Sequence, residues 1–302
     1  MNTSSAAPPP NDPHATDAPA PVDPAADACA HGPPTGHPWL RALGTVVTTV
    51  TGNVMLVLDT VVLGSIATVI GMVLPAGDRI IFHMMRLWSH LWLLSSGVRV
   101  TCRHAVPLDD DATYVFVVNH QSMFDIPVLL TTLPGQTRFL AKRGLFRLPI
   151  FGWALHAGGF IPVDRGRDAA RNAVTHALDR LENGASVLIF AEQTRSRDGH
   201  LLPFKRGGFL IGIRSGKPIV PVAIMGTLNI RPRGSMRITP QRVEVRYGAP
   251  VATEGLGYDD RQRVADTLRN RVADLIRAPA DGPLPIDDRP IVAEPDAAEP
   301  SA

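Results

Sequence analysis

A histidine and an aspartate lie close together just after an apolar run that we expect to form a buried strand. In Tyr114-Val-Phe-Val-Val-Asn-His120 the histidine ends the run, and Asp125 follows it after a short gap. An imidazole can take up a proton near neutral pH, and a carboxylate bonded to its other nitrogen would fix its tautomer. A continuous helix would turn the two side chains apart, so a turn between them is needed. Ser122 and Asp125 also fit an S-x-x-D helix cap, and their spacing leaves catalysis and capping equally open.

A second polar group closes the segment Phe160-Ile-Pro-Val-Asp-Arg165. A guanidinium at the end of a strand can hold an anion through two parallel hydrogen bonds. Arg165 could equally pair with Asp164 or Asp168 on the surface, and taken alone this segment favours the ion pair.

The segment that follows the apolar run Ser186–Phe190 is rich in groups that bind phosphate. A carboxylate comes first, and hydroxyl and cationic side chains follow it: Glu192, Thr194, Arg195, Ser196, Arg197, Lys205 and Arg206. Guanidinium groups match phosphate oxygens, and open α/β sheets bind ligands where strands end. We therefore expect this segment to bind an anion rather than to form only a solvated basic loop. The two cysteines give no zinc spacing, and no P-loop or G-x-G-x-x-G is present, so we predict neither a metal site nor a nucleotide site.

Strands and helices alternate around these segments, which predicts an α/β fold whose mostly parallel or mixed sheet is flanked by helices. The apolar runs predict strands at 114–118, 138–141, 160–163, 186–192, 217–224 and 243–247. Helical spacing predicts helices over 126–133, 169–183, 209–214 and 259–276.

Charge divides the chain into three parts. The Pro-rich ends, residues 1–38 and 278–302, carry acidic residues and are predicted to be disordered. Between them lie 29 basic and 18 acidic residues, a net charge of +11, whereas the whole chain has only +2. We assign 39–98 to a membrane-associated helical segment and 99–277 to an α/β domain. The basic centre predicts an anionic partner, but few aromatic residues accompany the arginines, which argues against nucleic acid.

An apolar run at residues 43–75 contains one acidic residue, Asp59, and no Lys, Arg or Glu. As one helix it would measure about 50 Å, longer than the roughly 30 Å hydrocarbon core of a bilayer. We expect either a single tilted membrane helix or a re-entrant hairpin with Asn53, Asp59 and Gly64 at its bend. A hairpin buried in a soluble core fits so apolar a run less well.

The next segment, residues 79–94, has helical spacing with tryptophans and arginines, which fits either a helix at the membrane surface or an ordinary packed helix. Four arginines follow the apolar run: Arg79, Arg86, Arg99 and Arg103. The positive-inside rule therefore predicts that the downstream domain lies on the cytoplasmic face of its membrane.

Together with Val220-Pro-Val222, the three polar segments resemble four sequence boxes of the glycerolipid acyltransferase family, whose best-known members are lysophosphatidic acid acyltransferases. The resemblance implies transfer of an acyl group from acyl-CoA or acyl carrier protein to a membrane lyso-lipid, with no further cofactor. It implies that His120 is the general base and that Asp125 orients it. It also implies an acceptor site that contains Arg165, Glu192, Thr194, Arg195, Ser196 and Lys205, and it favours a bacterial inner membrane as the location.

Two positions in the third box differ from the family pattern, because Ala191 replaces a proline and Gln193 replaces a glycine. Glycine there would permit an unusual backbone angle or close approach to a phosphate. The acceptor therefore stays open between 1-acyl-sn-glycerol-3-phosphate and another lyso-lipid, such as a lyso-ornithine lipid. A non-catalytic, basic membrane-surface protein is a further alternative. A serine hydrolase using Ser122 or Ser196 is disfavoured, because the chain has no G-x-S-x-G motif.

Overall fold

The computed structural model describes residues 37–74, 77–164, 166–232, 234–287, 289 and 291. Most of the two predicted Pro-rich ends, residues 1–36 and 292–302, lies outside this range.

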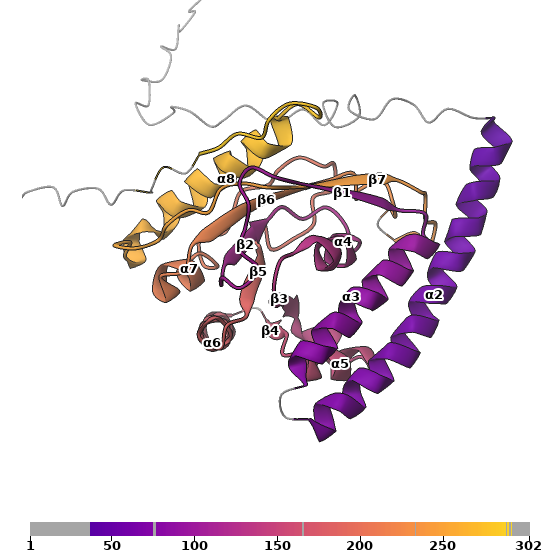
Figure 1. Ribbon diagram of the computed structural model, residues 1–302, viewed down its shortest axis with the longest axis horizontal. Coiled ribbons are helices and arrows are strands. Elements are labelled where there is room, and N and C mark those ends of the chain that lie inside the picture. The colour runs from indigo at the N-terminus through magenta and orange to yellow at the C-terminus, as the bar shows by residue number, and fades with distance from the viewer. Residues whose placement is uncertain are drawn as a thin grey trace, which may run out of the picture.

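A seven-stranded sheet with the order β1-β7-β6-β2-β5-β3-β4 forms the centre of the molecule (Figure 1). The strands are β1 (Arg99–His104), β2 (Val115–Val118), β3 (Thr137–Lys142), β4 (Ile161–Val163), β5 (Ser186–Phe190), β6 (Ile219–Met225) and β7 (Arg242–Tyr247). All neighbouring strands are parallel except β6 and β7, so β1 and β7 run opposite to the other five. The carboxyl ends of β2, β5 and β6 therefore meet at one edge, near the middle of the sheet. The predicted mixed, mostly parallel sheet is confirmed.

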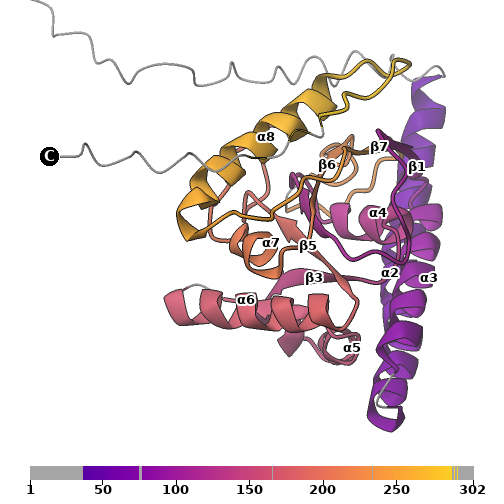
Figure 2. The same ribbon diagram turned by 60° about the vertical axis from the view of Figure 1, so that its left-hand side comes forward.

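Helices cover both faces of this sheet (Figures 1 and 2). One face carries α6 (Arg167–Glu182), α7 (Leu210–Ser215) and α8 (Arg261–Arg277), and the other carries α3 (Asp78–Ser95), α4 (Asp125–Thr132) and α5 (Phe151–Ala157). Short 3₁₀ helices lie at η1 (Arg143–Arg147) and η2 (Tyr258–Asp260). Along β2, Val115 and Val117 point to the first face and Phe116 and Val118 to the second, all fully buried. This alternation explains why the central strands read as continuous apolar runs.

The apolar run at 43–75 lies mostly in a single helix, α2 (Pro38–Val73), so the predicted hairpin within it is wrong. The other predicted arrangement, a single helix, is the one that forms. At the predicted bend, the side-chain nitrogen of Asn53 donates to Thr49 O at 2.7 Å within the helix and to Met236 O at 2.9 Å beside it. Glycines let α2 lie close to the domain. A Cβ at Gly64 would lie 2.8 Å from Ile150, and one at Gly71 would lie 2.4 Å from that of Ala157.

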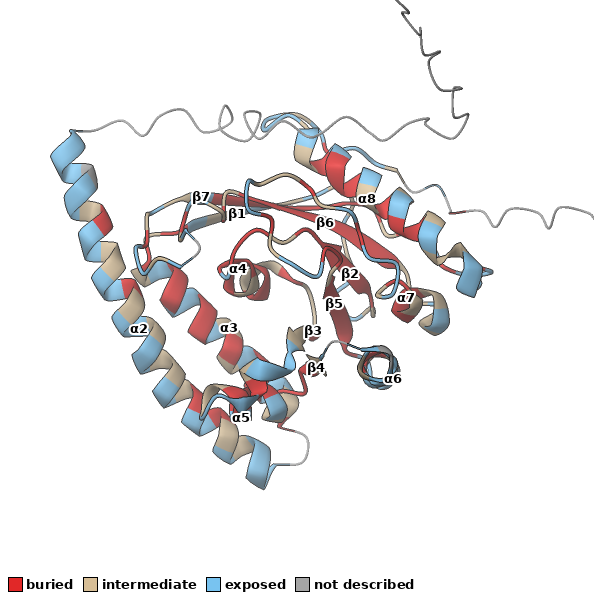
Figure 3. Ribbon diagram, turned by 180° about the vertical axis from the view of Figure 1, so that it is seen from behind, coloured by how far each residue is buried: buried red, intermediate tan, exposed pale blue. Residues whose placement is uncertain are grey.

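The outer face of α2 is apolar and exposed along its length (Figure 3). Exposed side chains include Trp39, Val46, Val50, Val57, Val61, Val69 and Met72. In the described part of the chain, α2 is the one helix long and apolar enough to cross a membrane. An exposed apolar face of this extent is typical of a membrane or protein contact.

The next helix, α3, packs into the domain and also exposes apolar side chains. Ile81, Phe82 and Trp92 are buried on its inner side, whereas Leu87 and Leu94 are exposed. Helix α3 is therefore a packed helix of the domain, and its outer side adds to the apolar surface of α2.

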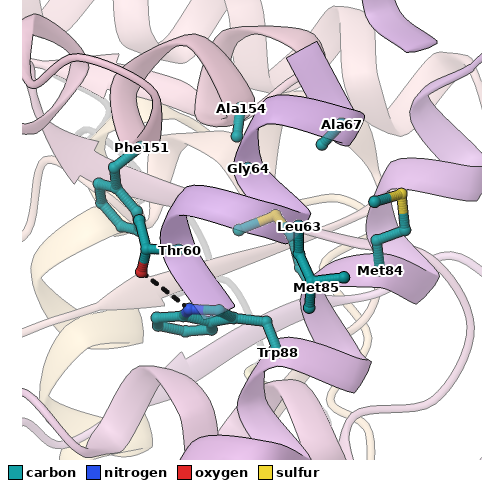
Figure 4. A pocket seen from close by; sticks show the side chains of 9 residues that line it. All are labelled: Thr60, Leu63, Gly64, Ala67, Met84, Met85, Trp88, Phe151 and Ala154. Atoms are coloured by element: carbon teal, nitrogen blue, oxygen red, sulfur yellow. Dashed lines mark hydrogen bonds between the residues drawn. The ribbon is translucent and has the colours of Figure 1, made fainter. Parts of the chain in front are cut away.

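The interface of α2, α3 and α5 encloses an apolar cavity of about 30 Å³ (Figure 4). Leu63 and Gly64 of α2, Met85 of α3 and Phe151 of α5 contribute to its wall. At one side of it the indole Nε1 of Trp88 donates to Thr60 Oγ1 at 3.0 Å. This bond satisfies polar groups that face the apolar contact between the two helices.

The described part of the C-terminal acidic segment packs against the domain. Leu284 and Ile291 are buried in the cluster that includes α8. The guanidinium of Arg103 on β1 donates to Ala280 O at 2.6 Å and also to Gly282 O. This stretch of the segment therefore adds to the core beyond the predicted domain boundary.

Candidate active site

Three neighbouring strands deliver polar residues to one edge of the sheet. His120 follows β2, Glu192 follows β5 and Thr227 follows β6. The amide of Asn119 continues the ladder between β2 and β6, since its nitrogen donates to Ile224 O at 2.9 Å and its oxygen accepts from Ile224 N at 2.8 Å. The Asn119 side chain therefore ties the end of β2, directly before His120, to the neighbouring strand β6.

Asp125 lies against the imidazole, with its Oδ2 atom 2.7 Å from His120 Nδ1. The same oxygen accepts from the backbone nitrogens of Gln121 at 2.7 Å and Ser122 at 3.0 Å. The chain between the two residues thus makes the turn that their spacing required. Helix α4 begins at Asp125 with Phe124 as its N-cap and no side-chain cap bond, so the predicted S-x-x-D helix cap does not form; the carboxylate instead fixes the turn and faces the histidine.

The other oxygen of Asp125 accepts from the hydroxyl of Thr227 at 2.5 Å. Asp125 and Thr227 are fully buried, and the side chain of His120 is 18% exposed. Because Nδ1 faces an acceptor, its proton points to the carboxylate and the lone pair of Nε2 is left for a ligand. The imidazole stacks on Phe190 with ring centroids 4.1 Å apart, which limits its rotation.

Glu192 is buried beneath the histidine and bonds backbone groups instead of facing the pocket. Its Oε1 accepts from His120 N at 3.0 Å, and its Oε2 accepts from Leu202 N at 3.4 Å. Burial raises the pKa of this carboxyl to about 8, against the lowering effect of the two backbone hydrogen bonds. In this geometry Glu192 positions the base and the loop that follows β5.

A pocket of about 440 Å³ opens beside the turn that follows His120. It is lined by Gln121 and Ser122 after β2, by Arg195, Ser196 and Arg197 after β5, and by Leu228, Asn229, Arg231 and Pro232 after β6. The loop after β5 is tied to the histidine, since Ser196 N donates to His120 O at 2.8 Å. His120 itself is not part of the lining, but Gln121 and Ser122 directly follow it, and a pocket with three guanidinium groups and no carboxylate in its lining can hold an anion.

The predicted acceptor residues fall into three groups. Arg195 and Ser196 line the pocket, although the Ser196 hydroxyl already donates to Asp198 Oδ1 at 3.0 Å. Thr194 and Lys205 are exposed and lie outside the pocket lining. Arg165 lies outside the described residues; the strand before it, β4, ends at the same edge of the sheet as β5.

Two residues of this site, Thr227 and Arg231, are absent from the sequence-based prediction. Both lie in the loop after β6, which has no periodic pattern. A signal was available, because the Val-Pro-Val box lies in β6, and parallel strands end at the same edge. Among the residues that the structure describes, no group of three or more His, Cys, Asp or Glu could hold a metal ion.

Gln193, which stands where the family has glycine, adopts a backbone φ of +57°. Few residues other than glycine enter this region, since the Cβ atom then approaches the backbone. Two backbone hydrogen bonds hold this turn: Gln193 N donates to Phe190 O at 3.0 Å, and Ala191 O accepts from Lys205 N at 2.8 Å. The backbone therefore keeps a conformation that suits glycine although the side chain has changed.

Comparisons with known proteins agree with this geometry. A protein-family model described as Acyltransferase matches residues 98–225. The chain is 42% identical over 166 residues to the chloroplastic 1-acyl-sn-glycerol-3-phosphate acyltransferase BAT2 of Brassica napus, covering 54% of this chain and 46% of that protein. It is 35% identical over 183 residues to 1-acyl-sn-glycerol-3-phosphate acyltransferase alpha of Homo sapiens, covering 60% and 65%. The match therefore spans about half to two thirds of the length of these relatives.

The fold is similar to the crystal structure of the 1-acyl-sn-glycerophosphate (LPA) acyltransferase PlsC from Thermotoga maritima. The TM-score is 0.66 at 24% sequence identity, and the alignment covers 78% of this chain and 97% of that one. This likeness extends beyond the α/β domain, because the aligned share of the chain is larger than residues 99–277.

Proposed function

Since residues 98–225 match the Acyltransferase family model, we propose that the chain is a member of this family and that it acylates the free hydroxyl of 1-acyl-sn-glycerol-3-phosphate to form phosphatidic acid. The acyl donor is a thioester, either acyl-CoA or acyl carrier protein. The observation that carries the proposal is the 2.7 Å contact between His120 Nδ1 and Asp125 Oδ2 beside a pocket with three arginines. A base next to a cationic pocket suits a substrate whose hydroxyl lies near a phosphate.

In the proposed reaction, Nε2 of His120 takes the proton of the acceptor hydroxyl while that oxygen attacks the thioester carbonyl. The tetrahedral intermediate then collapses, the carbon–sulfur bond breaks, and the imidazolium returns its proton to the leaving thiolate. Asp125 stabilises the imidazolium and keeps Nε2 free of a proton beforehand. General-base catalysis of this kind is worth about 10²–10⁴-fold in rate. No acyl-enzyme is needed, and the hydroxyl of Ser122 is buried.

The acceptor phosphate would bind Arg195 in the pocket, with Ser196 holding the loop in place. We propose that three residues outside the pocket lining also contribute to acceptor binding: Arg165, Thr194 and Lys205. Glu192 has a different proposed role, because its two hydrogen bonds position His120 and the following loop.

The exposed apolar faces of α2 and α3 support a membrane location. Helix α2 contacts α3, α5 and the loop after β6. If α2 crossed the bilayer, these parts of the domain would have to enter the membrane with it. We propose that both helices enter one leaflet and bring the pocket to the depth of lyso-lipid headgroups. The arginines that follow α2 favour the cytoplasmic face, in a bacterial inner membrane.

The test is thiol release from an acyl thioester by the full chain purified in detergent. We expect turnover with lysophosphatidic acid in preference to glycerol 3-phosphate, lysophosphatidylcholine and lyso-ornithine lipid. His120→Ala should abolish turnover, whereas His176→Ala, an exposed histidine on α6, should leave it unchanged.

Two results would contradict the proposal. Turnover that prefers lyso-ornithine lipid would assign a different acceptor. Binding to anionic vesicles without thioester consumption, equal in wild type and His120→Ala, would indicate a non-catalytic membrane-surface protein.

A further inference from the structure

One wall of the arginine-lined pocket comes from a loop to which the family boxes assign no role. This loop, residues 226–241, joins β6 to β7 and contributes Arg231 to the pocket lining. Arg195 and Arg197 lie on the opposite loop, after β5. The pocket thus places cationic groups from two separate loops around one space.

None of these three arginines is neutralised by an acid in the described part of the chain. The nine residues that line the pocket include no Asp or Glu, and Arg195, Arg197 and Arg231 form no ion pair there. The nearest carboxylate in sequence, Asp198, accepts from the Ser196 hydroxyl and from His200 N. Several buried arginines outside the pocket have an acidic partner, as Arg246 has in Glu244.

Arg231 is held in place by its own loop. Its Nε donates to Ser235 O at 2.7 Å, and one Nη atom lies 2.6 Å from the sulfur of Met236, so neither partner is a carboxylate. Partial burial lowers the pKa of the Arg231 guanidinium, but so basic a group stays charged at neutral pH. A desolvated cation held without a counterion is suited to bind an anion from outside the chain.

The loop itself is fixed to α2. Ile238 N donates to Thr49 Oγ1 at 2.9 Å, and the amide of Asn53 donates to Met236 O. Arg231 is therefore placed before any ligand arrives, which lowers the entropic cost of binding.

Building on the proposed function, we infer that Arg231 is a specificity-determining residue that binds the phosphate monoester of the acceptor together with Arg195. We assign the phosphate in this pocket to the acceptor and not to the acyl donor, because the two substrates differ in the distance between their reacting group and their phosphate. Gln121 and Ser122, which directly follow the base, line the same pocket. In the acceptor a short glyceryl link joins the reacting hydroxyl to its phosphate, whereas in acyl-CoA the long pantetheine arm separates the thioester from every phosphate.

The experiment compares Arg231→Gln and Arg231→Lys with Arg237→Gln, an exposed arginine of the same loop outside the pocket lining. We expect Arg231→Gln to raise the KM for lysophosphatidic acid about 10- to 100-fold, the range for a lost hydrogen bond to a charged group. The KM for acyl-CoA should change less than about twofold, and Arg231→Lys should restore part of the affinity because it keeps the charge. Arg237→Gln should behave as wild type.

Three results would overturn the inference. An unchanged KM for lysophosphatidic acid, or an equal change in Arg237→Gln, would remove Arg231 from the headgroup site. A raised KM for acyl-CoA alone would assign the pocket to the donor. Equal losses in Arg231→Gln and Arg231→Lys, with a lowered melting temperature in both, would indicate a purely structural role.

Failure of the proposed function can be told apart from failure of this inference. Wild-type protein without turnover on lysophosphatidic acid contradicts the function, and binding then decides the role of Arg231. A rise in the melting temperature with glycerol 3-phosphate in wild type but not in Arg231→Gln supports the inference. An equal shift, or no shift in either protein, contradicts it.

Discussion

The Oδ2 atom of Asp125 lies 2.7 Å from Nδ1 of His120 and at the same time closes the turn between the two residues. The contact that would orient a catalytic base is therefore built into the local backbone. A substitution at Asp125 must affect the turn as well as the imidazole.

Asp125→Asn is expected to lower kcat by about 10²–10⁴-fold and also to lower the melting temperature. An amide can keep its oxygen on the backbone N–H donors and the imidazole, but it carries no charge to stabilise the imidazolium, and its NH2 group replaces the oxygen that accepts from Thr227. Thr227→Val removes only the hydroxyl bonded to Oδ1, so its loss of kcat should be smaller. Thiol release and thermal unfolding measure both effects, and equal kcat losses in the two variants would contradict this order.

Glu192 should make the stability of the protein depend on pH. Its pKa is about 8 in the folded protein and ordinary in the unfolded chain, so between these values the folded state holds a proton that the unfolded state has lost. The free energy of unfolding should therefore fall as the pH rises from about 5 to about 8. Glu192→Gln has no proton to lose, and denaturant unfolding should show a flatter pH dependence for it. Parallel pH profiles for the two proteins would argue against the raised pKa.

The positive φ of Gln193 strains the backbone, so substitutions at this position should change the free energy of unfolding. Gln193→Gly relieves about 1–2 kcal/mol of backbone strain but adds about 0.5–1 kcal/mol of chain entropy, so stability should stay equal or rise slightly. Gln193→Val should destabilise by at least about 1 kcal/mol, because a β-branched residue is unfavourable at this angle. Glu254→Val, at an exposed turn with ordinary φ, is the control in denaturant unfolding. A Gln193→Val variant no less stable than this control would refute the strain.

Two glycines of α2 provide a test of how the helix is attached. A Cβ at Gly71 would lie 2.4 Å from that of Ala157 on α5, whereas one at Gly44 meets nothing within 4 Å. Gly71→Ala should destabilise by about 1–3 kcal/mol through overpacking, and Gly44→Ala should stabilise by up to about 1 kcal/mol through helix propensity. Unfolding in detergent measures both. The attachment of α2 to α5 would be in doubt if the two variants behaved alike.

The sequence predicted the sheet and its main helices because the central strands and the amphipathic helices have strong periodic patterns. It did not predict β1, an edge strand whose burial does not alternate, or α5, a short helix without a long apolar face. It could not choose between a single helix and a hairpin with a bend near Asn53, since one partner of this residue, Met236 O, lies far away in the chain. Long-range partners of this kind leave no local signal.

The same limit applies to the site. The sequence supplied His120 and Asp125 because local spacing and a strand end mark them. The role in ligand binding that it gave Glu192 stays a prediction; in the fold the oxygens of that side chain accept from backbone nitrogens. Thr227 and Arg231 entered the site only once the order of strands was known, because a sheet edge gathers residues that are distant in sequence.

The hydrogen bonds between Thr49 and Ile238 have a practical consequence for protein engineering. A shortened enzyme that begins at α3, made to avoid detergent, would remove the support of the loop that carries Arg231. Its solubility would improve while the affinity for phosphorylated acceptors that we propose declined, so the two properties cannot be optimised separately. Replacing exposed valines on the outer side of α2 with polar residues, while retaining Thr49 and Asn53, is the better route to a water-soluble catalyst.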